Sequence, residues 1–206
     1  MNLHKILTYC ALLLAMPLCM ANNNDTYQVS SPDATINLIV TPGDSLYVSV
    51  AVDDVTYART TVGLDMRGIG AIGNNASVSN VERRHVEGDI IVIEGDQPSI
   101  HENFNEMTLD MGNFSLICRA YNEGVAWRMV TNIDDESVIV NNELVDFTFT
   151  GTPAVWFSEA PAAMNQWDLS YVRYNSVADV PAGKFSVNPM MIKYEDTGLG
   201  LTIIES

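Results

Sequence analysis

Short stretches rich in β-branched and aromatic residues follow one another along almost the whole chain, and each is ended by Gly, Asn, Asp or Pro. "ATINLIV", "SLYVSVAV" and "VTYARTTVGLDM" come first, separated by Pro42-Gly43-Asp44 and Asp53-Asp54. Later stretches are "DIIVIEG", "NEMTLDM", "FSLICRAY", "VAWRMVTN", "ESVIVNN", "VDFTFTG", "AVWFS", "KFSVNPMMIKY" and "LGLTIIES". No segment keeps a 3.6-residue apolar period, and there is no heptad or regular repeat. The pattern therefore predicts an all-β fold, an antiparallel sandwich.

The charge balance excludes one class of partner. The chain has 206 residues, 10 Lys and Arg against 26 Asp and Glu, and a net charge of −16. Nucleic-acid phosphates must be neutralised by basic side chains, so we expect no nucleic-acid partner. A chain of this length can bury about 70% of its unfolded surface, so its core needs no disulfide or metal.

The first 21 residues have the pattern of a Sec signal peptide. His4 and Lys5 precede an apolar run that ends at Cys19, and Ala21 stands before the polar "NNND". The run is too short for a membrane span, so we expect residues 1–21 to be a leader, residues 22–206 the mature domain, and the location periplasmic or secreted. The alternative is a lipoprotein signal with Cys19 as the lipidated residue.

Cys118 is the only cysteine after residue 21, so the mature chain has no internal disulfide. Its position in "FSLICRA" predicts a small buried apolar side chain. The alternative, a nucleophilic thiol, needs a base close by, and only His85 and His101 remain to supply one.

Several clusters of charged residues are more typical of turns and loops than of metal or catalytic sites. Asp53-Asp54 and Asp134-Asp135-Glu136 are expected in turns, and they lack the spacing of an EF-hand. Glu82-Arg83-Arg84-His85 is expected on a solvated loop, and residues 68–80 are expected to form another loop. No pair of carboxylates is singled out by its spacing, so no catalytic residue is assigned.

The stretch "LICRAYNEGVAWRM" predicts a β-hairpin with a tight "YNEG" turn. Arg119 and Arg128 lie on opposite strands, and each shares its strand face with apolar residues. Such an arginine either pairs with a carboxylate and locks the strands, or contacts a sugar or a neighbouring domain.

The sequence resembles the N-terminal domain of glycoside hydrolase family 97 over essentially all of residues 27–206. The opening "SPD" at 31–33 and "NE" at 105–106 match family motifs, and "LGLTIIES" resembles the closing I-T-E-A strand, with Ile204 for Thr and Ser206 for Ala. The most specific match is "RAYNEGVAWR", which contains the hairpin residues Arg119, Tyr121, Asn122, Gly124, Trp127 and Arg128.

The resemblance implies a β-super-sandwich of the galactose-mutarotase type. In the family this domain packs on a catalytic (β/α)₈ barrel in α-glucosidases and α-galactosidases, helps form the wall of the site for an α-linked glycan, and lies near a calcium ion. No alternating βα pattern is present here, so we expect a domain without its barrel, inactive alone and truncated from a longer enzyme.

The resemblance also assigns candidate contacts. Glu205 matches the glutamate of the closing motif and is expected to be one calcium ligand, effective only when the barrel supplies the others. The alternative for Glu205 is a solvated acid at a strand end. Trp156 and Trp167 are either sugar-stacking residues or part of the core or an interface. For the whole chain, the alternative to an enzyme domain is a free-standing carbohydrate-binding or adhesive β-sandwich.

Overall fold

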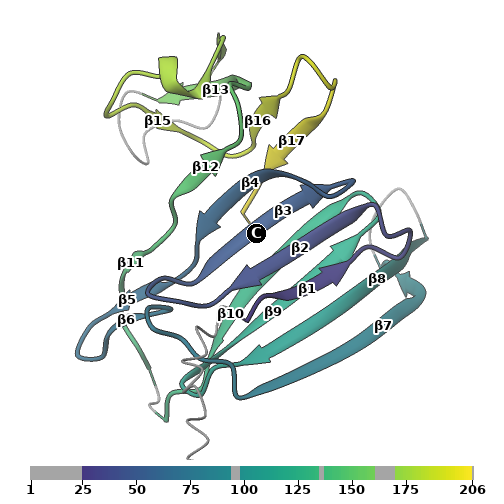
Figure 1. Cartoon of the computed structure of the whole chain (residues 1–206), viewed down its shortest axis with the longest axis vertical. Coiled ribbons are helices and arrows are strands. Elements are labelled where there is room, and N and C mark those ends of the chain that lie inside the picture. Colours follow the sequence, from purple (N-terminus) through teal and green to yellow (C-terminus); the bar gives the residue numbers. More distant parts are fainter. Residues whose placement is uncertain (1–24, 94–97, 135–136, 161–169, 206) are drawn as a thin grey trace, which may run out of the picture.

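The computed structural model of the chain describes residues 25–93, 98–134, 137–160 and 170–205. The expected leader at 1–21 and Trp167 lie outside these residues. Within the described part every strand pair is antiparallel. Figure 1 shows two sheets lying face to face, with a smaller sheet at one end of the molecule. The all-β antiparallel fold predicted from the sequence is therefore confirmed.

The strands are arranged in four sheets, and neighbours are named in order of pairing. The first large sheet contains β1 (Tyr27–Ser30), β2 (Ile36–Thr41), β3 (Tyr47–Val52), β4 (Val55–Thr61) and β12 (Phe147–Phe149). The second large sheet contains β10 (Gly124–Thr131), β9 (Phe114–Tyr121), β8 (Ser99–Asp110) and β7 (Asn80–Ile91).

Two smaller sheets complete the described structure. One contains β11 (Val140–Glu143), β5 (Leu64–Met66) and β6 (Gly70–Ile72). The end sheet contains β14 (Tyr171–Tyr174), β13 (Ala154–Ala160), β16 (Met190–Lys193) and β17 (Gly200–Ile203), and β15 (Phe185–Ser186) also pairs with β13. A single 3-10 turn, Val177–Asp179, follows β14.

The main core fills the space between the two large sheets. Every second residue of β9 is buried, and these are Phe114, Leu116, Cys118 and Ala120, as the alternation in the sequence predicted. Opposite them, Leu38 and Val40 of β2 and Val48 of β3 are almost fully buried. The period of two residues thus assigns one face of each strand to the core and leaves the other free for polar side chains.

A second, smaller core lies beneath the end sheet. Val155 and Ile192 are its fully buried aliphatic residues. Tyr194 packs edge-on against Tyr57 of β4, with ring centroids 4.8 Å apart, and its hydroxyl donates to the carbonyl oxygen of Tyr57. The end sheet is therefore attached to the sandwich through β4.

The structure corrects two expectations about loops. Residues 68–80 do not form one continuous loop, because Gly70–Ile72 pairs with β5 as strand β6. Glu82-Arg83-Arg84-His85 lies inside β7, an edge strand, instead of in a loop. Side chains of β7 are polar on both faces, so the alternation that marks a half-buried strand is missing there.

Asp53 and Asp54 form a two-residue turn between β3 and β4, as expected, with φ angles of 48° and 65°. Two positive φ angles are the signature of the type I′ turn that matches the twist of a hairpin. These acids therefore serve the hairpin, and no group of three or more His, Cys, Asp or Glu side chains within the described residues is placed to hold a metal ion.

Candidate functional site

The polar centre of the second large sheet is Glu106, on the face of β8 that points away from the main core. In the strand register Glu106 lies opposite Arg84 of β7 and Arg119 of β9. Arg84 Nε lies 2.5 Å from Glu106 Oε1, and Arg119 Nε lies 2.7 Å from Glu106 Oε2. The Glu106 side chain is only 7% exposed, so two guanidinium groups neutralise a largely buried carboxylate.

The electrostatics of Glu106 follow from this arrangement. The hydrogen bond from Arg84 lowers the pKa of Glu106 most, and burial opposes it, but the hydrogen bond and the positive charge of Arg119 keep the net shift downward. Glu106 is therefore ionised at neutral pH and acts as a structural acceptor, because a general acid would need a raised pKa.

Arg119 also covers an aromatic side chain. Its guanidinium carbon lies 4.5 Å from the centroid of the Phe104 ring, and the Tyr121 ring lies 4.9 Å from the same centroid. Phe104 is buried although it shares the outward face with Glu106. The planar guanidinium thus supplies an ion pair and covers the Phe104 ring at the same time, which a compact lysine ammonium does less well.

The two arginines of the hairpin have different roles. Arg119 forms a cross-strand ion pair with Glu106, which is one of the two alternatives that the sequence left open. Arg128 is exposed, and no ion pair of Arg128 is found within the described residues. Arg84 holds the second position beside Glu106, and the sequence analysis missed it because it placed residues 82–85 in a loop. The sequence carries no clear signal for this pair, because the strand register that places Arg84 opposite Glu106 is set by long-range pairing.

The opening and hairpin motifs meet at one corner of the sandwich, 89 residues apart in sequence. The Asn122 side-chain oxygen accepts a hydrogen bond from the backbone N–H of Asp33 at 3.1 Å. The Asp33 carboxylate accepts bonds from Ser31 Oγ at 2.6 Å and from Thr35 N and Oγ1. These bonds, that from Ser31 most, lower the pKa of Asp33 and hold the β1–β2 turn.

The free edge of β1 is held by side chains of the opposite sheet. Asn105 Nδ2 donates to the carbonyl oxygen of Ser30 at 2.8 Å, and Arg83 Nη1 donates to that of Gln28 at 2.6 Å. Asn105 Oδ1 also lies 2.9 Å from His85 Nδ1. Asn105 and Glu106, adjacent in the sequence, therefore have separate roles: Asn105 joins the two sheets, and Glu106 joins three strands within one sheet.

Trp156 lies in a row of side chains across the end sheet. Arg173, Trp156 and Met191 are opposite one another in the register, and the Arg173 guanidinium carbon lies 5.2 Å from the Trp156 ring centroid. Arg173 also donates to Asn175 at 2.5 Å and to Glu195 at 3.0 Å. Trp156 is half-buried, and Met191 is 39% exposed. The row is thus a partly open aromatic surface with polar groups at its border.

Glu205 lies two residues beyond β17 and is exposed. A carboxylate is the oxygen ligand that calcium prefers, so Glu205 fits the role of one ligand. Calcium takes about 6–8 oxygen ligands, and the described residues contain no cluster that would supply the others.

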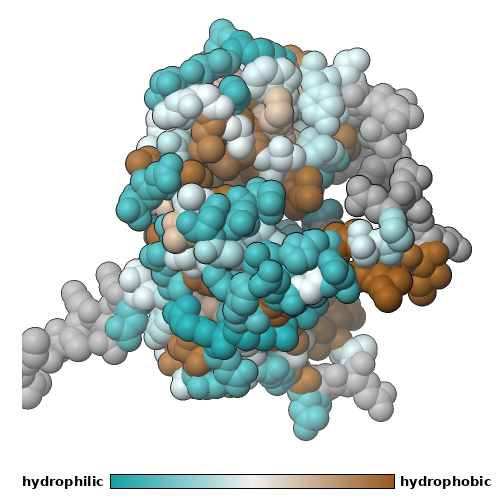
Figure 2. Space-filling model, turned by 90° about the vertical axis from the view of Figure 1, so that its right-hand side faces the viewer, coloured by the Kyte–Doolittle hydropathy of each residue, from teal (hydrophilic) through white to brown (hydrophobic). Residues whose placement is uncertain are grey.

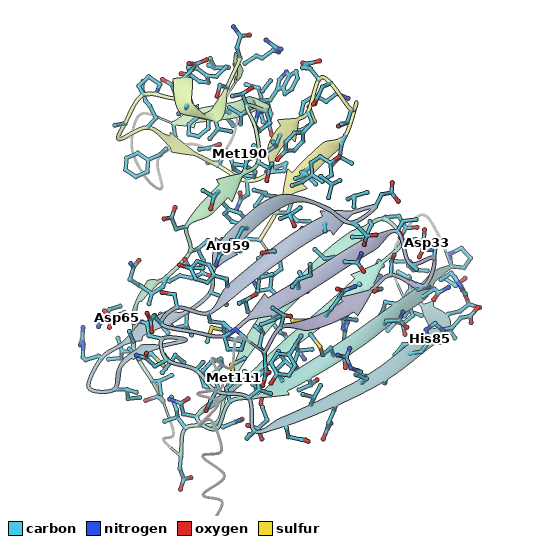
Figure 3. The ribbon with its side chains drawn as sticks, viewed as in Figure 1. Asp33, Arg59, Asp65, His85, Met111 and Met190 are labelled. Carbon is cyan, nitrogen blue, oxygen red and sulfur yellow. The ribbon has the colours of Figure 1, made fainter. Side chains whose placement is uncertain are left out.

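Cys118 is fully buried in the main core, and burial raises the pKa of its thiol to about 12. The thiolate is the reactive form, so Cys118 is a packing residue and not a nucleophile. A hollow of about 220 Å³ lies beside the polar centre, and Glu82, Arg83, Arg84, Glu106 and Thr108 line it. Figure 3 labels His85 and Asp33 at the same end of the two large sheets.

Comparisons with known proteins agree with this architecture. The family model described as glycosyl-hydrolase 97 N-terminal matches residues 29–206. A family 97 glycoside hydrolase from Pseudoalteromonas sp. strain K8, solved in complex with acarbose, has a TM-score of 0.72 and 18% identity, covering 82% of this chain and 27% of that one. A variant from the same strain, solved with panose, has a TM-score of 0.70 at the same identity and coverage.

A β-arabinopyranosidase structure has a TM-score of 0.67 and 18% identity, covering 81% of this chain and 29% of that one. Among curated proteins, none matches the sequence. No helix within the described residues is long and apolar enough to cross a membrane. The chain spans less than a third of the solved enzymes that share its fold, and it belongs to the family of glycosyl-hydrolase 97 N-terminal domains.

Proposed function

We propose that this chain is the non-catalytic N-terminal domain of a periplasmic or secreted α-glycosidase, an α-glucosidase or α-galactosidase. In this role it packs on a (β/α)₈ barrel and helps to shape the site for an α-linked glycan. The observation that carries the proposal is the family match over residues 29–206. The relatives solved with acarbose and with panose support a glycan as the ligand of the complete enzyme.

The chemistry of the described acids supports a non-catalytic role. Glycoside hydrolysis needs a protonated carboxyl group as the acid, and its pKa must be raised. The three carboxylates with a resolved shift, Asp33, Glu106 and Glu159, all have lowered pKa values. For Glu159 the main cause is the hydrogen bond from Lys184, and Tyr174 donates a second. These groups stabilise structure and do not donate protons at neutral pH.

The proposal includes Glu205 as one calcium ligand of the complete enzyme. Its exposure and its place directly after the last strand leave the carboxylate free to meet ligands from a following domain. Calcium bound there would supply positive charge beside the sugar. The 206-residue chain alone should bind calcium weakly, with a Kd of about 1 mM or above, because one carboxylate leaves most of the coordination to water.

The first test is the DNA sequence after the codon of Ser206. An open frame that encodes alternating β and α segments would support the enzyme domain, whereas a stop codon would contradict it. If the frame continues, the full-length protein should hydrolyse an α-glucoside or α-galactoside. Glu205→Gln should then weaken calcium binding about 10-fold or more, while Glu195→Gln, also at an exposed acid of the end sheet, should leave it unchanged.

A second candidate function is glycan binding by a free-standing domain. The row of Arg173, Trp156 and Met191 favours it, because an aromatic face bordered by hydrogen-bonding groups is suited to a sugar ring. This function predicts saturable binding of α-glucan oligosaccharides by the isolated chain, measured by tryptophan fluorescence and lost in Trp156→Ala. If binding does not saturate, the glycan-binding candidate is excluded, and the proposal of an enzyme domain is unaffected.

A further inference from the structure

The β7–β8 hairpin extends beyond the sheet to which it belongs. The two strands pair over their full lengths of 12 residues, from Asn80–Asp110 to Ile91–Ser99. Pairing of β8 with β9 begins only at Phe104. Residues 87–91 and 99–103 therefore form a two-stranded projection, here named the β7–β8 arm. Among the described residues no third strand pairs with it. A two-stranded ribbon is only marginally stable in water.

Large apolar side chains are exposed to solvent on the arm and just beyond its β7 strand. Ile90 and Ile100 face each other across the strands and are 49% and 52% exposed. Ile91, on the opposite face, is 81% exposed, and Ile93 just beyond it is 97% exposed. Figure 2 shows a hydrophobic projection on the right of the molecule, next to a mostly hydrophilic body. Ile90 and Ile100 form an apolar pair on one face, and large exposed apolar side chains gathered on one projection are typical of an interaction surface.

The charges beside these isoleucines limit what can cover them. Glu87, Asp89 and Glu102 lie on the same arm, and the His101 ring nitrogen lies 3.1 Å from the Asp89 carboxylate. A second copy of a chain with net charge −16 would bring like charges together, which opposes self-association. The arm instead fits an apolar cleft with basic residues at its border.

The length comparison identifies a partner of suitable size. This chain covers 27% of the family 97 enzyme from Pseudoalteromonas sp. strain K8 and 29% of the β-arabinopyranosidase. In both proteins the larger part of the polypeptide lies outside the domain that shares this fold. We propose that the β7–β8 arm inserts Ile90, Ile91 and Ile100 into an apolar, basic-bordered cleft of the catalytic portion of the same enzyme. The inference rests on the proposed function and names the surface through which the domain docks.

The test compares the full-length gene product with the 206-residue chain by hydrogen exchange and mass spectrometry. Amides of residues 87–91 and 99–103 should exchange about 10-fold more slowly in the full-length protein, because a docked ribbon opens less often. The double variant Ile90→Ser/Ile100→Ser should abolish this protection. The matched control is Ile69→Ser, an exposed isoleucine between β5 and β6, and it should leave the protection intact.

The outcomes separate this inference from the proposed function. A full-length protein that hydrolyses α-glycosides, but whose arm exchanges as fast as in the 206-residue chain, overturns the docking and leaves the proposed function standing. A gene that encodes no catalytic portion overturns both. Arm protection that depends on concentration in the 206-residue chain, together with a dimer in sedimentation, assigns the arm to a second copy and also overturns the docking.

Discussion

At the scale of single residues, the most informative side chain is Glu106, because its ion pairs with Arg84 and Arg119 link three strands. Its carboxylate is 7% exposed, whereas the Arg84 and Arg119 side chains are 60% and 33% exposed. The guanidinium groups therefore keep most of their hydration while the carboxylate loses its own. Removing either arginine leaves the carboxylate short of one donor, and the cost depends on how far the other arginine compensates.

Arg119→Ala should lower the free energy of unfolding by about 1–3 kcal/mol, because it removes one donor of Glu106 and the cover of Phe104. Arg128→Ala, on the other strand of the same hairpin, should change it by less than about 0.5 kcal/mol, since Arg128 is exposed. Urea unfolding followed by tryptophan fluorescence would measure both. Equal losses in the two variants would contradict the separation of roles.

The same carboxylate predicts a dependence of stability on pH. The pKa of Glu106 is lowered from the ordinary value of 4.5 in the folded protein, so the folded state favours the ionised form. Its contribution is complete above that value and is lost as the pH falls through the lower, folded-state pKa. Glu106→Gln should therefore flatten the loss of stability below pH 4.5, as measured by thermal unfolding at a series of pH values. Parallel curves for variant and wild type would refute this assignment.

At the scale of elements, the hairpin of β5 and β6 depends on Gly63 and Gly73, where the backbones on its two sides approach each other closely. A Cβ atom on Gly63 would lie 2.6 Å from the carbonyl oxygen of Ile72, and one on Gly73 would lie 2.5 Å from that of Val62. Gly73 also has a φ of 101°, outside the range that side chains favour. The short hairpin can fold back against the end of β4 only because these two residues have no side chain.

Gly73→Ala should lower the free energy of unfolding by about 2–4 kcal/mol, from backbone strain and the clash with Val62 together. Gly112→Ala is the matched control, because Gly112 has a φ of 84° but no atom within 4 Å of an added Cβ. Its cost should be only the strain, about 1–2 kcal/mol. Chemical unfolding of both variants tests the difference, and equal costs would show that the close approach is relaxed easily.

At the scale of the whole molecule, the second core contacts the sandwich where Tyr194 packs against Tyr57 of β4. The Tyr194 side chain is almost fully buried, and burial raises the pKa of its phenol to about 12. Its hydroxyl binds the carbonyl of Tyr57, which also accepts a bond from Thr150 N at 3.0 Å. This contact is one of those that attach the end sheet to β4.

Tyr194→Phe should cost only about 0.5–1.5 kcal/mol, because the carbonyl of Tyr57 keeps its bond to Thr150. Tyr194→Ala should cost about 3–5 kcal/mol, because it opens a cavity in the second core. It should also increase hydrogen exchange in β13, β16 and β17 more than in β8 and β9. A uniform increase in all strands would contradict this expectation and would mean that the two cores unfold as one unit.

The amino-acid sequence by itself determined the fold class and much of the core. Alternation in β9 assigned Phe114, Leu116, Cys118 and Ala120 to one buried face, because the period of a strand is independent of its partners. The turn at Asp53-Asp54 was also readable, since turn chemistry is local. The "RAYNEG" hairpin was also predicted, because its turn residues are a local signal. The likeness of this motif to family 97 domains is confirmed by the family match.

Only the tertiary structure decided which side chains meet. The pairing of Glu106 with Arg84 instead of Arg128 depends on strand order and register, which long-range pairing sets. β7 was misread because, at the edge of its sheet, polar residues occupy both of its faces. The exposure of Ile90, Ile91 and Ile100 likewise arises because β8 continues past the end of β9. Strand patterns determine faces, but the lengths of neighbouring strands determine what remains open for a partner.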